Sequence, residues 1–174
     1  IAGLRLGVTT DTQDTTGTTL TEQPVQVTRA QLEDTLHRFL GPQEQIPPMY
    51  SAVKIGGQKL YELARRGQEV ARRPRAITIH ELELSDGSGA DYTLRVRCSK
   101  GTYVRTLCHD IGQALGCGGC MSSLRRTAAG SFTLQQAVTM QQVLDFAVQH
   151  DPQQLLLLLD AIFAKHPALI VTLQ

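Results

Sequence analysis

The segment Lys100-Gly101-Thr102-Tyr103-Val104-Arg105 brings two cations and an aromatic ring into one short stretch of chain. The segment joins a predicted strand to a predicted helix, and such a junction offers backbone N–H groups at a helix N-terminus, where anions bind. Arg105 lies one turn into that helix and can pair with a carboxylate through two parallel hydrogen bonds. The chemistry indicated is the binding of phosphate or carboxylate groups.

A second group of basic and aromatic residues surrounds the Gly56-Gly57 turn: Tyr50, Lys54, Lys59 and Tyr61. From Lys54 to Arg126 the chain carries thirteen Lys and Arg against seven Asp and Glu, whereas the flanks carry four against nine. The formal net charge of +1 therefore hides a basic middle between acidic flanks. A basic stretch with interleaved aromatic rings favours a phosphate-bearing partner such as a nucleic acid, although a solvated charged face remains the alternative for any one pair of arginines.

The length and composition narrow the class of protein. With 174 residues, 41% hydrophobic and 19% charged, the chain suits one ordinary domain or two small ones and argues against wholesale disorder. The longest apolar run, residues 155–159, is far too short to span a membrane as a helix. The chain begins with neither Met nor an apolar leader, which suggests a cut rather than a translation start. We expect a cytoplasmic protein with reduced cysteines.

The spacing of the cysteine, histidine and aspartate residues argues against a metal site or a redox site. Cys117-Gly118-Gly119-Cys120 lacks the second ligand pair of a structural zinc site, since Cys98 and Cys108 lie ten residues apart. A redox CxxC usually opens a helix, whereas this one follows a helix end, where glycines serve a turn. The five histidines show no i, i+4 pair, and the Asp11–Gly17 loop lacks the ligand spacing of a calcium site. We therefore expect no metal and no cofactor.

The elements that position these residues follow from periodicity and capping signals. Strict alternation over residues 92–98 predicts a strand, and a capping box at Thr28 predicts the start of a helix. A second strand is predicted over residues 77–84, with an irregularity near His80. Because the turn-forming residues 86–89 lie between the two strands, we expect a hairpin. The predicted strands cover residues 4–8, 77–84, 92–98 and 132–134, and the predicted helices cover residues 28–40, 60–66, 104–115 and 139–149, with a last one from Asp151-Pro152. Interspersed strands and helices of this kind predict an α+β fold with a mixed, mainly antiparallel sheet and flanking helices.

Four ordered segments resemble hallmark motifs of the TruB family of tRNA pseudouridine synthases. They are Leu6-Gly7-Val8-Thr9-Thr10-Asp11-Thr12-Gln13-Asp14-Thr15-Thr16-Gly17; Ile46-Pro47-Pro48-Met49-Tyr50-Ser51-Ala52-Val53-Lys54 with Tyr61-Glu62-Leu63-Ala64-Arg65-Arg66-Gly67; Cys98-Ser99-Lys100-Gly101-Thr102-Tyr103-Val104-Arg105-Thr106; and Leu124-Arg125-Arg126-Thr127. Residues 1–143 resemble the C-terminal portion of the family's catalytic domain. Residues 144–174 resemble a helical tail and linker that leads towards a further C-terminal domain. The family often has His near Cys120, and this departure weakens any role for that turn in RNA contact.

The resemblance assigns a role to individual residues. Arg105 matches the Arg that ion-pairs with the family's nucleophilic Asp and keeps it ionised. Tyr103 matches an aromatic that lines the uridine pocket, and Leu124 matches the apolar residue that packs on the flipped base; a plain core leucine is the alternative for Leu124. The residues expected to contact RNA are Tyr50, Lys54, Lys59, Lys100 and Arg126.

The implied activity is the cofactor-free isomerisation of uridine 55 in the tRNA T-arm to pseudouridine, by a monomer. The family's nucleophile lies in a Gly-x-x-Asp-Pro-x-Ala-x-Gly stretch, which these 174 residues do not contain. Its base-stacking Tyr would fall immediately before Ile1. We therefore expect the chain alone to be inactive. Neither Asp11 nor Asp14 is assigned as the nucleophile instead. Two alternatives remain open: a non-catalytic RNA-binding module on the same scaffold, and a zinc-binding domain that uses the four cysteines.

Overall fold

The structure, a computed structural model, describes residues 1–149 and 156–157. The chain divides into two compact units, Ile1–Arg125 and Arg126–Gln174. The helix predicted from Asp151-Pro152 and the apolar run 155–159 lie wholly or largely outside the described residues. No helix in the described ranges is long and apolar enough to cross a membrane.

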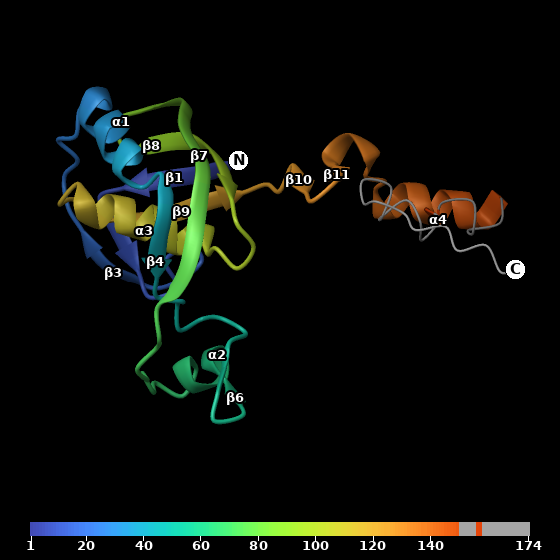
Figure 1. Cartoon of the computed structure of the whole chain (residues 1–174), viewed down its shortest axis with the longest axis horizontal. Coiled ribbons are helices and arrows are strands. Elements are labelled where there is room, and N and C mark those ends of the chain that lie inside the picture. The colour runs from blue at the N-terminus through green and yellow to red at the C-terminus, as the bar shows by residue number, and fades with distance from the viewer. Residues whose placement is uncertain (150–155, 158–174) are drawn as a thin grey trace, which may run out of the picture. The chain divides into compact units, whose positions relative to one another are not determined.

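A five-stranded sheet forms the centre of the first unit, with the strand order β4-β7-β8-β1-β9 (Figure 1). Every neighbouring pair in it is antiparallel. The strands are β1 (Ala2–Leu6), β4 (Gly41–Gln45), β7 (Arg75–Ser88), β8 (Asp91–Cys98) and β9 (Gly119–Leu124). With the helices described below, this confirms the predicted α+β class and its antiparallel sheet.

Two helices, α1 (Arg29–Arg38) and α3 (Val104–Ala114), pack against the sheet and against each other. The apolar face of each helix enters one core with the inward residues of the strands, because 3.6-residue and two-residue periodicities place apolar side chains on one side. The fully buried leucines and isoleucines of this core are Leu4, Leu6, Leu32, Leu36, Ile79, Leu94, Leu107 and Ile111. The α1 capping box at Thr28 is confirmed, with the Thr28 and Gln31 side chains bonded to each other's backbone N–H groups.

Helix α3 approaches β9 unusually closely through two glycines. A Cβ placed on Gly112 would lie 2.2 Å from the backbone N of Gly119, and one placed on Gly119 would lie 3.0 Å from the Cα of Gly112. Any side chain at Gly112 would therefore push the helix off the strand. This contact fixes the depth of α3, which carries Tyr103 and Arg105 at its N-terminal end.

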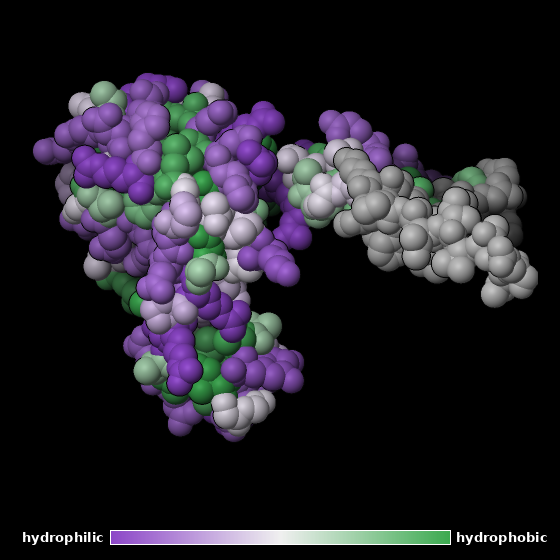
Figure 2. All heavy atoms as spheres, viewed as in Figure 1, coloured by the Kyte–Doolittle hydropathy of each residue, from purple (hydrophilic) through white to green (hydrophobic). Residues whose placement is uncertain are grey.

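Residues 46–74, between β4 and β7, form an insertion that extends away from the sheet (Figure 1). It contains a two-stranded ribbon of β5 (Lys54–Ile55) and β6 (Gln58–Lys59) and the short helix α2 (Leu60–Ala64). Leu60 and Leu63 are buried within it, and Figure 2 shows hydrophobic residues visible on this face of the insertion, bordered by hydrophilic ones. A further ribbon pairs β2 (Val8–Thr10) with β3 (Thr19–Glu22).

The second unit contains a ribbon of β10 (Ala128–Ala129) and β11 (Phe132–Thr133), the 3₁₀ helix η1 (Leu134–Gln136) and the helix α4 (Met140–Gln149). The capping interaction predicted at Thr139 is present, since its hydroxyl accepts from the Gln142 N–H.

The structure departs from the sequence predictions at several places. The strand predicted over residues 4–8 is interrupted, because Gly7, with φ of 82°, separates β1 from β2, and β2 pairs in a different sheet. The β7–β8 turn is Gly89-Ala90, not residues 86–89, because Asp86–Ser88 continue β7 as far as the Ser88↔Asp91 pair. The irregularity predicted near His80 is present, and the register shifts again between Leu84 and Asp86. The edge strands β4 and β9 were not predicted, because the polar residues of β4 and the small ones of β9 show no alternation.

Candidate functional site

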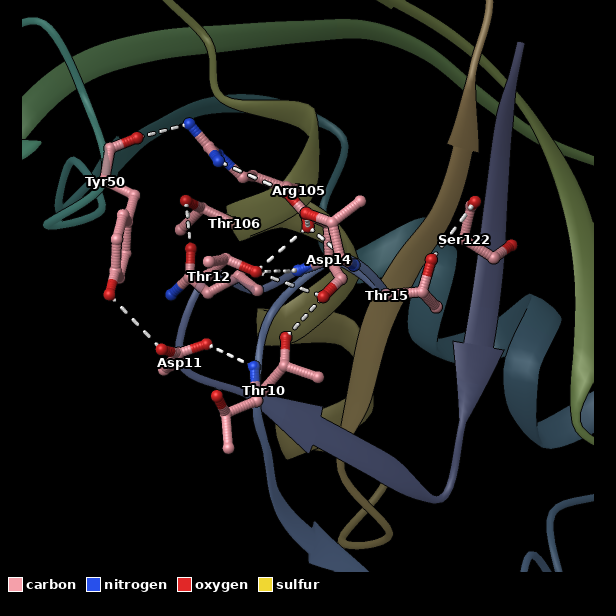
Figure 3. A network of polar contacts seen from close by, with 12 residues as sticks. Thr10, Asp11, Thr12, Asp14, Thr15, Tyr50, Arg105, Thr106 and Ser122 are labelled. Carbon is pink, nitrogen blue, oxygen red and sulfur yellow. Dashed lines mark hydrogen bonds and ion pairs between the residues drawn. The ribbon is translucent and has the colours of Figure 1, made fainter.

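Arg105 stands at the centre of a polar network that joins three distant parts of the first unit (Figure 3). Its Nη1 lies 3.2 Å from Oδ2 of Asp14, and its Nη2 donates to the backbone carbonyl of Tyr50. The Arg105 side chain is 24% exposed and that of Asp14 is 15% exposed. A partly buried, charge-assisted pair of this kind is screened less by salt than a pair on the open surface.

Asp14 is held by its own loop, residues 11–17, which connects β2 to β3. Its carboxylate accepts hydrogen bonds from the Thr12 hydroxyl and from both the hydroxyl and the backbone N–H of Thr16. Partial burial alone would raise the pKa of Asp14, but these bonds and the charge of Arg105 outweigh it and hold that pKa below its usual range. Asp14 is therefore a fixed anion that orients Arg105.

A second link runs beside the first. The Thr106 hydroxyl donates to Oε1 of Gln13 at 2.6 Å, so that consecutive residues of α3 bind consecutive residues of the loop. Gln13 adopts a left-handed conformation, with φ of 65°, and is the only non-glycine residue with positive φ in the described ranges. Its carbonyl also accepts from the Met121 N–H, which ties the loop to β9. The arrangement locks the start of α3 to the loop.

Tyr50 connects the same network to the 46–74 insertion. Its phenol donates to Oδ2 of Asp11 at 3.3 Å, and the negative charge of Asp11 raises the pKa of the Tyr50 phenol. The other Asp11 oxygen accepts from the Thr18 N–H. Asp11 and Asp14 therefore both serve as hydrogen-bonded anchors of the loop.

Tyr103 is the N-cap residue of α3 and offers no capping side chain of its own. Gln45, at the end of β4, contacts its backbone twice. The Tyr103 N–H donates to Oε1 of Gln45 at 2.8 Å, and Nε2 of Gln45 donates to the Tyr103 carbonyl at 3.1 Å. The structure thereby fixes the backbone of a residue that lies two positions before Arg105.

The expected RNA-contacting cations occupy different surroundings. Lys54 and Lys100 are exposed. Lys59 is half-buried; its Nζ donates to the Tyr61 hydroxyl at 3.1 Å, and the Arg65 guanidinium also stacks on the Tyr61 ring. Arg126 is exposed and belongs to the second unit. Of the predicted site residues, the network brings together Arg105 and Tyr50, with Tyr103 adjacent, and the assigned roles of all of them stay predictions.

Leu124 lies at the end of β9, where it pairs with Ala2. Its side chain is 53% exposed, so Leu124 is not a core residue in this chain. The interpretation of Leu124 as a plain core leucine is therefore wrong. An exposed leucine remains available to pack on a base.

The first half of the CxxC segment, Cys117-Gly118, lies in the turn between α3 and β9, as predicted, whereas Gly119 and Cys120 begin β9. Cys117 and Cys120 are buried free thiols, and burial raises the pKa of nearby Cys108 to about 12. Within the described part of the chain, no three His, Cys, Asp or Glu side chains gather in a group that could hold a metal ion. The four cysteines therefore do not assemble the site that a zinc-binding domain would need.

Sequence reasoning missed the contributions of Asp14, Gln13 and Gln45 to this site. Asp14 was rejected both as a calcium ligand and as the nucleophile, without a partner being assigned to it. Neither glutamine carries a sequence signal, since its partner lies 58 or more residues away.

The fold and site define a mixed α+β domain with an oriented arginine in the first turn of α3. Residues 1–104 match the model of the TruB family pseudouridylate synthase N-terminal domain, and residues 105–164 match that of the tRNA pseudouridylate synthase B C-terminal domain. The chain belongs to the TruB family of pseudouridylate synthases. The boundary between the two models falls at the start of α3, inside the first compact unit.

The chain is similar to tRNA pseudouridine synthase B of Azoarcus sp. (strain BH72), with 56% identity over 140 residues that cover 80% of this chain and 47% of that protein. It is also similar to the protein of the same name from Pseudomonas putida (strain F1), with 52% identity over 140 residues that cover 80% and 46%. The chain thus spans about half the length of these curated relatives.

Among solved structures, a Cbf5–Nop10–Gar1 complex contains a similar chain, with a TM-score of 0.58 and 27% identity over 84% of this chain and 36% of that one. An H/ACA RNP bound to a substrate RNA containing 2′-deoxyuridine contains another, with a TM-score of 0.55 and 24% identity over 84% and 32%. The second likeness concerns the fold alone.

Proposed function

We propose that this chain is part of a tRNA pseudouridine synthase that isomerises uridine 55 of the tRNA T-arm. The observation that carries the proposal is the position of Arg105 in a chain of this family, held between Asp14 and the Tyr50 carbonyl. A guanidinium has five N–H donors, and these two bonds leave donors for another carboxylate. Arg105 is thus prepared to bind and orient an anionic nucleophile.

The chemistry requires a nucleophilic Asp, which the family carries in a Gly-x-x-Asp-Pro stretch that these residues do not contain. The proposal therefore assigns the complete reaction to the whole protein. This chain contributes the arginine that keeps the carboxylate ionised, because a fixed cation lowers the pKa of an adjacent carboxyl group. Tyr103 lines the uridine pocket, and Leu124 packs on the base once it leaves the stack.

The RNA would bind across the basic middle of the chain. Lys54 and Lys100 are exposed cations that can contact phosphates. Lys59 and Arg65 add two cations close to the Tyr61 ring. Tyr50 lies where the insertion joins the network, so RNA bound along the insertion would reach the Arg105 site. Arg126 is proposed as a further phosphate contact. The proposed partner is the T-arm stem-loop, bound by a cytoplasmic monomer without a cofactor, and residues 1–143 are proposed as the catalytic portion.

The test uses an extended chain, in which an upstream segment of the Azoarcus relative that includes the family's Gly-x-x-Asp-Pro stretch precedes Ile1. Pseudouridine is mapped in an unmodified tRNA transcript and in a matched transcript with cytidine at position 55. Product at position 55 of the first transcript alone supports the proposal. RNA binding without product would instead support a non-catalytic RNA-binding module.

A further inference from the structure

Gln45 is almost fully buried, with 4% of its surface exposed, although its amide is strongly polar. It ends β4, at the edge of the sheet, and pairs in register with Arg75 of β7. Residues 46–74 follow directly, so Gln45 lies where the sheet gives way to the insertion. A buried amide at such a place needs partners for both its carbonyl and its NH₂ group.

Both partners belong to one residue, Tyr103, which lies 58 positions further along the chain. The amide accepts the Tyr103 N–H at 2.8 Å and donates to the Tyr103 carbonyl at 3.1 Å. That carbonyl also accepts the Leu107 N–H, which is the first hydrogen bond of α3. The Gln45 amide thus pairs with the backbone of Tyr103 as a neighbouring strand would, and it fixes the residue at which α3 begins.

We propose that Gln45 is a positioning residue for pseudouridine formation. By holding both backbone groups of Tyr103, it sets the direction of the Tyr103 ring and the place of Arg105, two residues into the helix. This inference rests on the proposed function. A misplacement of reacting groups by about 1 Å can slow a reaction about 100-fold. Loss of the Gln45 hydrogen bonds should therefore slow the chemical step and leave RNA binding unchanged.

The central variant is Gln45→Met in the extended chain, which keeps the length of the side chain and removes both hydrogen bonds. Gln43→Met is the matched control, since Gln43 lies on the same strand and its amide donates to the Phe39 carbonyl, away from the site. We expect kcat to fall about 10- to 100-fold in Gln45→Met, with KM within about three-fold of the parent, and neither to change in Gln43→Met. A kcat within three-fold of the parent, or equal losses in both variants, would overturn the proposal.

A second measurement needs neither activity nor a variant. In the 174-residue chain, the Tyr103 amide should exchange with deuterium as slowly as the interior amides of α3, because Gln45 accepts its proton. Exchange at the rate of an open loop would overturn the proposal even if Gln45→Met failed to fold. The parent assay separates the two ideas: an inactive parent refutes the proposed function, whereas an active parent with an unaffected Gln45→Met refutes only the role of Gln45.

Discussion

Arg105 and Asp14 are 91 residues apart in sequence and form a partly buried ion pair, with 3.2 Å between Nη1 and Oδ2. The pair joins the first turn of α3 to the loop after β2, and Arg105 also holds the backbone of Tyr50. An arginine with two such partners has little freedom to move. Its remaining donors therefore point in a fixed direction, which is what the orientation of a nucleophile requires.

The hydrogen bonds from Thr16 and Thr12, together with the ion pair to Arg105, should make the stability of the fold depend on pH. The pKa of folded Asp14 lies below that of the unfolded chain, about 3.9, so the unfolded chain binds more protons between the two values. The stabilisation by Asp14 is complete above about pH 5 and is lost as pH falls through the folded pKa. We expect Asp14→Asn to lower the free energy of unfolding at pH 7 by about 1–2 kcal/mol, and the difference from the parent to shrink below about pH 4.

Urea unfolding of both proteins between pH 3 and pH 8 measures this difference. Glu33→Gln is a suitable control, because Glu33 forms an exposed pair with Arg29 on α1. A difference between Asp14→Asn and the parent that stays constant over the whole range would contradict the assignment of Asp14 as an ionised anchor.

Leu124 should matter for activity more than for stability. Because its side chain is 53% exposed, Leu124→Ala should cost less than about 1 kcal/mol of unfolding free energy, whereas Leu94→Ala, at 0% exposure, should cost about 2–5 kcal/mol. In the extended chain, Leu124→Ala should lower kcat about 10-fold, because the proposed apolar contact with the flipped base would be lost. Thermal unfolding tests the predicted stability, and steady-state kinetics test the predicted loss of kcat. Full activity of Leu124→Ala would show that Leu124 does not contribute to the site.

The basic surface should contribute salt-dependent affinity for RNA. Lys54→Ala combined with Lys100→Ala should weaken binding of a T-arm hairpin and reduce the magnitude of the slope of log K against log salt by about 1–2. With each phosphate contact removed, binding of the RNA releases fewer counterions. Fluorescence anisotropy at several salt concentrations measures the slope. Arg29→Ala, which removes an exposed cation outside the basic middle, should leave it unchanged. Identical slopes for the double variant and the parent would refute the phosphate contacts.

Gly112 should tolerate no side chain. Its Cβ would meet backbone atoms of Gly118 and Gly119 at 2.2–2.5 Å, and backbone cannot move aside as a flexible side chain can. Gly112→Ala should therefore destabilise the chain by about 2–3 kcal/mol, despite the higher helix propensity of alanine. The exposed neighbour Gln113→Ala should be nearly neutral in the same denaturation experiment. A stabilised Gly112→Ala would show that α3 does not approach β9 so closely.

The sequence predicted the elements whose burial follows a regular period, and the structure confirms them. Strand β8 alternates strictly and α1 carries a capping box, so both were found. Strands β4 and β9 were missed, because Gly41–Gln45 is polar and Gly119–Leu124 is stabilised by neighbours that lie far away in sequence. The resemblance singled out Arg105, but no local pattern could show that Asp14 and Gln45 support this end of α3, since those contacts exist only once the sheet has formed.

The most direct test of the central claim compares three proteins on one T-arm hairpin: the 174-residue chain, the extended chain, and the extended chain with Arg105→Ala. Pseudouridine is measured by mass spectrometry after digestion of the RNA. We predict product from the extended chain alone, with loss of at least about 100-fold on Arg105→Ala, because the nucleophile then lacks its cation. Product from the 174-residue chain, or undiminished activity of Arg105→Ala, would contradict the account.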